Sequence, residues 1–196
     1  MSSPQATEGA ARASTKRTSV IVGLVFAAAL MRLLPHPANL TPIGALALFG
    51  GAHFRSRSLA FAVPLFAMLA SDVVLFAAFG WGFNSLTVAV YASTVFAALL
   101  GHGMLGRITP AQVAGRSLLA AVAFFLVTNA AVWLTAGLYP VNASGLVACF
   151  VAAIPFFGNT LAGHALYGAV LFGGFALLQR RFEVLRLGVA TGVATS

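Results

Sequence analysis

The chain has 196 residues, of which 60% are hydrophobic and only 7% are charged. This small number of polar side chains cannot cover the surface of a water-soluble domain. The composition therefore predicts an integral membrane protein. The net charge is +8, but the basic residues lie in short clusters beside apolar stretches, a pattern of membrane topology rather than of nucleic-acid binding.

The first 18 residues are rich in Ser, Thr, Ala and Gly and carry Arg12, Lys16 and Arg17. This composition predicts a disordered basic tail at residues 1–18. A cleaved signal peptide is not expected, because the apolar run that follows leads into Arg32 instead of a small-residue cleavage site.

Apolar stretches that are candidates for membrane crossings follow the tail, if one crossing takes about 20 residues. They lie at residues 19–34, 40–54, 59–80, 85–105, 117–137 and 156–178. The second stretch is short and contains Pro42 and several glycines, so we expect it to be tilted, broken or partly re-entrant. The run 145–154 is too short to span and is separated from the last crossing by Pro155, which predicts a surface or re-entrant helix.

Ten of the eleven basic residues fall into clusters that are separated by two predicted crossings each. These clusters are Arg12, Lys16 and Arg17; Arg55 and Arg57; Arg107 and Arg116; and Arg180, Arg181 and Arg186. The positive-inside rule then places both chain ends in the cytoplasm. The predicted fold is an all-α, polytopic membrane helix bundle with about six transmembrane helices at residues 19–180, followed by a cytoplasmic tail at 181–196.

Two opposite charges, Arg32 and Asp72, lie inside the apolar stretches and toward the same, outer side of the membrane. A lone charge at membrane depth costs at least a few kcal/mol, so such residues face the bundle interior and pair. Other polar side chains fall in the same outer layer, whereas the inner half is apolar, which favours an outward-facing pocket over an open channel. The candidate substrate-binding residues are Arg32, His36, Asn39, Asp72, Asn129, Trp133, Asn159 and His164.

Each candidate also has a purely structural interpretation. Arg32 and Asp72 would then be a salt bridge that ties two helices together, and Asn129 and Asn159 would hydrogen-bond across helices. His164 would be a core histidine that is hydrogen-bonded to its neighbours.

The sequence contains no enzyme motif. It has three acidic residues in all, so paired-carboxylate catalysis is not expected, and it has no phosphate-binding loop and no metalloprotease or nucleophile-elbow motif. The single cysteine, Cys149, excludes an intramolecular disulfide. We therefore predict no catalytic activity, no cofactor and no metal site.

Several short motifs carry a family resemblance over about residues 20 to 180. They are Arg32 to Asn39 followed by Pro42 to Ala45, Ser71-Asp72, Thr128-Asn129 with Trp133, and Pro155 to Phe157 with Asn159 to Leu161. The chain resembles an uncharacterised family of small bacterial membrane proteins, which is similar to the S components, the substrate-binding subunits of energy-coupling factor vitamin transporters. The resemblance implies a multi-pass protein of the bacterial cytoplasmic membrane that holds a small ligand beneath its outer loops. It also implies a partner membrane subunit and ATPases that drive uptake.

The leading hypothesis is thus a membrane transport subunit that binds a small solute, either vitamin-like or another metabolite. Its expected partners are membrane lipid and a coupling module of a membrane subunit and ATPases. Binding of nucleic acid is not expected. One alternative is a proton- or ion-coupled carrier in which Asp72 and His164 titrate as a pair. The other is a membrane scaffold without a transported solute.

Overall fold

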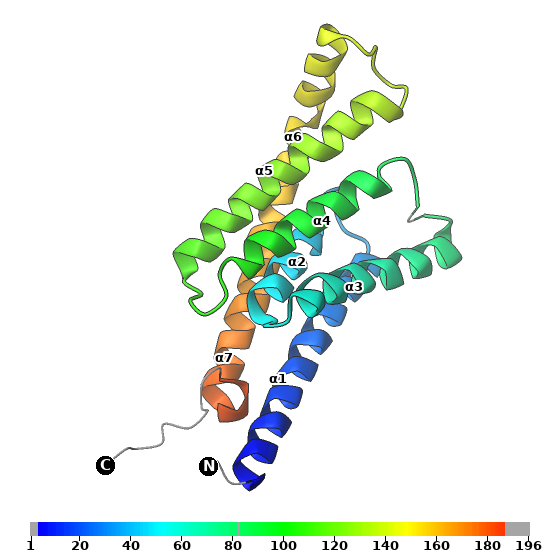
Figure 1. Ribbon diagram of the computed structural model, residues 1–196. Helices are drawn as coiled ribbons and strands as arrows, with labels where there is room; N and C mark the ends of the chain where they lie inside the picture. The colour runs from blue at the N-terminus through cyan, green and yellow to red at the C-terminus, as the bar shows by residue number, and fades with distance from the viewer. Residues whose placement is uncertain (1–3, 82, 187–196) are drawn as a thin grey trace.

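The computed structural model describes residues 4–81 and 83–186, which form helices and connecting turns without a strand (Figure 1). The elements are α1 (Pro4–Leu30), η1 (Met31–Leu33), α2 (Ile43–His53), α3 (Arg57–Phe79), α4 (Thr87–His102), α5 (Pro110–Thr135), α6 (Ala143–Gly168), η2 (Ala169–Gly173), α7 (Gly174–Arg181) and η3 (Glu183–Leu185). The predicted all-helical class is confirmed. Here η1 and η3 are 3₁₀ turns, and η2 is a π-helical turn inside the last long helix.

Among the residues that the structure describes, three helices are long and apolar enough to cross a membrane, which is consistent with a membrane protein. They are Arg57–Phe79, Pro110–Thr135 and the continuous helix Ala143–Arg181, which comprises α6, η2 and α7. Two shorter apolar helices, α2 and α4, lie beside them. Many large apolar side chains on the long helices are exposed, for example Phe66, Val147 and Leu177, as expected for surfaces that face lipid.

The short helix α2 is the centre of the bundle. Every residue of α2 except Gly44 is buried, and α2 contacts α1, α3, α4, α5 and α6. Its 11 residues rise about 16 Å, which is about half of a bilayer's hydrocarbon core. Because α2 is enclosed by protein, a helix shorter than one crossing can lie inside the bundle without contact with lipid. The stretch 40–54 was predicted to be tilted, broken or partly re-entrant, and its helical part is the unbroken α2.

Glycines bring α2 and α4 into close contact. A Cβ atom added at Gly51 would overlap the Ala98 carbonyl oxygen, and one added at Gly101 would overlap the Leu48 carbonyl oxygen. Small residues are the usual means by which helix backbones approach each other inside membranes. Here they allow the backbones of α2 and α4 to pack closely at two positions, Gly51 of α2 and Gly101 of α4.

The prediction of a disordered tail is wrong for residues 4–18, which form the first part of α1. This segment carries an ion pair one turn apart, in which the Arg12 Nη2 atom lies 2.5 Å from the Glu8 Oε1 atom. Arg17 is buried and donates to the His53 carbonyl oxygen at 2.9 Å. Local helix propensity and this tertiary anchor outweigh the polar composition that predicted disorder.

The predicted break at Pro155 is also wrong, because α6 runs unbroken from Ala143 to Gly168. Asn142 begins the helix by accepting a hydrogen bond from the Gly145 amide at 2.9 Å. On either side of Pro155, the Phe150 and Phe157 rings both pack against the Phe125 ring of α5, with centroids 5.6 and 5.0 Å apart. This packing on α5 holds both halves of α6 in line and offsets the backbone hydrogen bond that proline lacks.

The last part of the described chain folds back on the bundle. The Gln179 side-chain amide donates to the Leu185 carbonyl oxygen at 3.1 Å, and Leu185 is buried in the cluster that includes α1 residues. Arg186 lies 3.9 Å from Glu183. Of the segment predicted as a cytoplasmic tail, residues 187–196 lie outside the described residues.

Candidate functional site

The predicted pairing of Arg32 with Asp72 is confirmed. The Arg32 Nη2 atom lies 2.7 Å from the Asp72 Oδ1 atom, and the side chains are 12% and 3% exposed. Arg32 belongs to η1, which tightens the end of α1, and Asp72 lies on the buried face of α3. The ion pair thus connects the end of α1 to α3, both of which are apolar segments.

Further hydrogen bonds hold both charged groups in place. The Arg32 Nη1 atom donates to the Ser71 hydroxyl at 2.5 Å and to the Met68 carbonyl oxygen at 3.4 Å. The other carboxylate oxygen of Asp72 accepts a bond of 2.8 Å from the Tyr91 hydroxyl of α4. Hydrogen bonds to ionised groups are the strong ones in proteins, so the carboxylate and the guanidinium are fixed in direction as well as position.

The ion pair forms one wall of a cavity of about 250 Å³. The cavity lies where α3, α4 and α5 meet the segments that precede α2 and α4. Its lining residues are Arg32, Asn39, Thr41, Ile43, Asp72, Leu75, Asn84, Leu86, Thr87, Val90, Tyr91 and Phe124. A charged pair, two amides and three hydroxyl groups therefore share one small cavity with apolar side chains.

Two asparagines reach this cavity from connecting segments. Asn39 has φ of 65°, a left-handed conformation that asparagine tolerates better than most residues. Asn84 is held in the turn before α4, where its Oδ1 atom accepts from the Leu86 amide at 2.8 Å. Both amides thus line the cavity from defined turns.

Asn159 and His36 do not line the cavity. His36 belongs to the segment before α2, and Asn159 contacts that segment from α6. The Asn159 amide donates to the Ala38 carbonyl oxygen at 2.9 Å, which ties α6 to the residue next to Asn39. His36 bonds through Nδ1 to the Leu34 carbonyl oxygen at 2.7 Å. These two hydrogen bonds therefore hold the segment that carries Asn39 in its conformation.

Asn129 and Trp133 also lie apart from the cavity. The Asn129 amide donates to the Phe125 carbonyl oxygen of its own helix at 2.8 Å, and the Trp133 indole donates to the Pro140 carbonyl oxygen at 2.9 Å. These bonds brace α5 and the α5–α6 turn. Of α5, it is Phe124 that contributes to the cavity.

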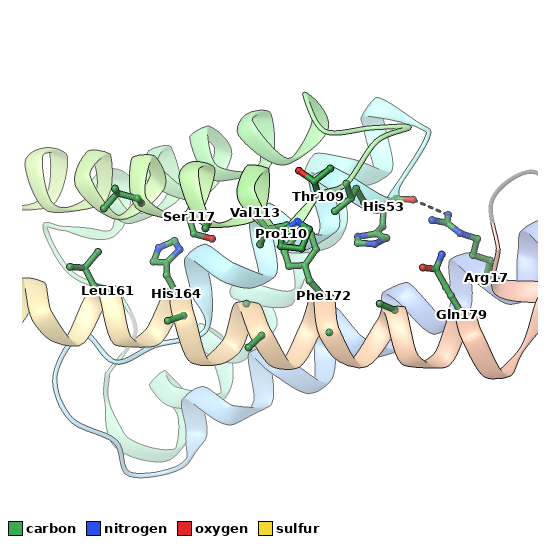
Figure 2. Close-up of a pocket in the computed structure, with 18 residues that line it drawn as sticks. Arg17, His53, Thr109, Pro110, Val113, Ser117, Leu161, His164, Phe172 and Gln179 are labelled. Carbon is green, nitrogen blue, oxygen red and sulfur yellow. Dashed lines mark hydrogen bonds between the residues drawn. The ribbon is translucent and has the colours of Figure 1, made fainter.

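His164 lines a different and larger cavity, a groove between α5 and the α6–η2–α7 helix (Figure 2). Its ring is buried and lies so close to Gly44 that a Cβ atom there would overlap the imidazole. Asp72 and His164 therefore line separate cavities, and this argues against the two acting as a directly coupled titrating pair.

Of the predicted set, the cavity brings together Arg32, Asn39 and Asp72. Tyr91, Thr41 and Thr87 join them, and the sequence marks them only weakly because single hydroxyl groups are common in membrane helices. Tyr91 is 19 positions from Asp72, and only the packing of α4 on α3 shows that the two residues meet.

Replacing Tyr91 with Phe tests how much the hydroxyl contributes to this arrangement. We expect Tyr91→Phe to lower the free energy of unfolding by about 1.5 to 3 kcal/mol, because a buried carboxylate loses a hydrogen bond. Thermal unfolding of the purified protein in detergent measures the change. Tyr167→Phe, the same substitution at a partly buried residue packed against the core, is the control, and an equal loss in both variants would contradict the role of the Asp72 contact.

A family of unknown function (DUF6580) matches the chain over residues 12–185. No curated protein and no solved structure matches the chain. These comparisons give no support for the resemblance to the S components of energy-coupling factor transporters. Because the family match covers most of the chain, the protein belongs to the DUF6580 family.

Proposed function

We propose that this protein is a membrane subunit that binds a small polar or anionic solute in the cavity beside Arg32 and Asp72. The observation that carries the proposal is the buried ion pair at 2.7 Å on the wall of a cavity that also holds the Asn39 and Asn84 amides. Charged residues inside membrane bundles mark solute or ion paths more often than structural ties. A salt bridge with a structural role alone needs no cavity beside it.

The chemistry of the lining defines the class of solute. Arg32 has five N–H donors in a planar fork, which suits a carboxylate or phosphate on the solute. Asp72 and the two amides supply acceptors for hydroxyl or amino groups. On binding, a solute anion would share or replace the Asp72 carboxylate as the partner of Arg32.

The cavity volume limits the size of the solute. About 250 Å³ is below the range of about 300 to 1,000 Å³ for drug-sized ligands. It corresponds to roughly eight water molecules at about 30 Å³ each. A compact metabolite fits this space better than a large vitamin does.

Topology supports a role in uptake. The positive-inside pattern places the chain ends and the Arg55 and Arg107 segments in the cytoplasm, so the Arg32–Asp72 cavity would face the outside. With no nucleotide-binding motif in the sequence, energy for transport would come from a separate membrane subunit and ATPases, as in S-component systems.

Mass spectrometry of co-purifying small molecules tests the proposal. The protein is purified in mild detergent and denatured, and the released molecules from wild type, Arg32→Gln and Asn39→Gly are compared. Asn39→Gly removes one amide from the cavity and keeps the backbone conformation accessible, because glycine adopts positive φ freely. We expect a small polar metabolite in wild type and at least tenfold less of it in both variants.

Arg116→Gln is the matched control. Arg116 also donates to a backbone carbonyl oxygen, that of Leu100, but it does not line the cavity. Equal retention by all four proteins would place any bound molecule elsewhere. A wild-type protein that releases no such molecule, and that no polar metabolite stabilises against heat, would favour the membrane scaffold.

A further inference from the structure

The large groove is built very differently from the solute cavity. It has a volume of about 780 Å³ and runs between α5 and the α6–η2–α7 helix. Figure 2 shows Arg17, His53 and Gln179 toward one end of the groove and His164 and Leu161 toward the other. The wall between them is predominantly apolar, and it includes Val113, Leu118, Ala165, Ala169 and Phe172.

Arg17 places a buried cation at one end of this groove. The residue is only 7% exposed, and its Nη1 atom donates to the His53 carbonyl oxygen at 2.9 Å. The Nε and Nη2 atoms are buried and have no hydrogen-bond partner among the described residues. The Phe175 ring lies 5.7 Å from the guanidinium carbon, and such a contact stabilises the cation without satisfying its N–H donors.

No acidic side chain neutralises Arg17. The chain has three acidic residues, and each is occupied elsewhere: Glu8 pairs with Arg12, Asp72 with Arg32, and Glu183 lies nearest Arg186. Burial, and then the charge of Arg55, lower the pKa of the Arg17 guanidinium, but an arginine stays protonated in proteins. A buried charge with two free donors calls for an anion from outside the chain.

Small residues keep the groove open along its length. Gly168 and Gly173 line it, and a Cβ atom added at either would meet no other side chain or neighbouring helix within 4 Å. From His164 to Gln179 the helix rises about 22 Å at about 1.5 Å per residue. That length exceeds half of the hydrocarbon core of about 30 Å, so it accommodates an extended acyl chain of one leaflet.

From these observations we infer that the groove binds an anionic membrane lipid, with its headgroup phosphate at Arg17 and an acyl chain along the apolar wall toward His164. The lipid phosphate would supply the counter-charge that Arg17, which lines the groove, lacks within the chain. An unpaired cation at one end and an apolar channel behind it match an amphiphile, whereas a soluble anion would leave the channel unfilled. This site is separate from the Arg32–Asp72 cavity and does not depend on its function.

Native mass spectrometry of the full chain in detergent tests the inference. The protein is titrated with phosphatidylglycerol or with phosphatidylcholine of identical acyl chains. We expect wild type to bind the anionic lipid more tightly and Arg17→Gln to bind it at least tenfold more weakly. Lys16→Gln removes the same charge from the adjacent, exposed position of α1 and is expected to bind within about twofold of wild type.

A second pair of variants tests the acyl-chain channel without touching a charge. Ala165→Phe fills the groove and is expected to weaken binding of both lipids at least tenfold, whereas Ala162→Phe, at an exposed position outside the groove, leaves it unchanged. Size-exclusion profiles establish that each variant is folded. Equal losses in Arg17→Gln and Lys16→Gln, no preference of wild type for the anionic lipid, or full displacement by inorganic phosphate would each overturn the inference.

Discussion

Replacing Arg32 with Met is expected to lower the free energy of unfolding by about 3 to 5 kcal/mol, the usual cost of leaving a buried charge without its partner. The Asp72 side chain is 3% exposed, so its charge would stay largely buried after the guanidinium is removed. Tyr91 would still donate to one carboxylate oxygen, but a single neutral donor does not compensate for the lost cation. Denaturant or thermal unfolding in detergent measures this loss.

The double variant Arg32→Met/Asp72→Leu is expected to recover most of that stability. Removing both charges removes the desolvation cost of both, and buried ion pairs are often replaced by apolar residues with little net effect. Arg12→Met is the control for loss of a charge pair, because Arg12 and Glu8 are 75% and 63% exposed, and it should cost at most about 1 kcal/mol. If the single and double variants unfold alike, removing the Asp72 charge relieves no cost in the Arg32→Met background, and an uncompensated buried carboxylate is not what destabilises Arg32→Met.

The same double variant separates function from structure. A stable double variant that no longer retains the solute would assign the ion pair to binding. A stable double variant that retains it fully would leave the pair as a tie between α1 and α3, which is the scaffold interpretation.

Substituting Gly51 or Gly101 with Ala is expected to destabilise the protein by about 3 kcal/mol, the upper end of the usual cost of overpacking. The added Cβ atoms would overlap the carbonyl oxygens of Ala98 and Leu48. Backbone atoms cannot move aside as a flexible side chain can, so α2 and α4 would have to separate. Because α2 contacts most of the other helices, that movement would disturb the whole bundle.

Gly158→Ala is the matched control for these variants. A Cβ atom at Gly158 would meet nothing within 4 Å, and alanine is favoured over glycine in a helix by up to about 1 kcal/mol. We therefore expect its unfolding temperature to be equal to or above that of wild type. Unchanged stability of Gly51→Ala and Gly101→Ala would show that α2 and α4 are less closely packed than in this structure.

The structure agrees with the sequence where local composition decides. Long apolar runs form long helices, as at Arg57–Phe79 and Pro110–Thr135. The free energy of transferring such a segment out of water depends mainly on its own side chains, so the sequence of the segment is enough to predict it. The pairing of Arg32 with Asp72 was also predictable, since each charge is otherwise too costly among apolar residues and few opposite charges are available.

The sequence was a poor guide where neighbours decide. The sequence predicts a helix end at Pro155, but α6 continues through it, with Phe150 and Phe157 packed against Phe125 on either side. Of the polar residues assigned to one outer layer, Asn129 bonds to its own helix and His164 faces a separate groove. Position along a helix gives the depth of a side chain but not the direction in which it points within the bundle.

By itself, the sequence determined the all-helical class, the apolar segments long enough to cross a membrane, and the pairing of Arg32 with Asp72. Only the tertiary structure decided which other polar side chains join them, since Tyr91 and Asn84 line the cavity whereas Asn129 and His164 do not. It also revealed that Arg17 is buried at the end of a groove. The physical reason is that transfer energies are summed along the chain, whereas a binding site depends on the relative placement of helices, which is set by packing between residues distant in sequence.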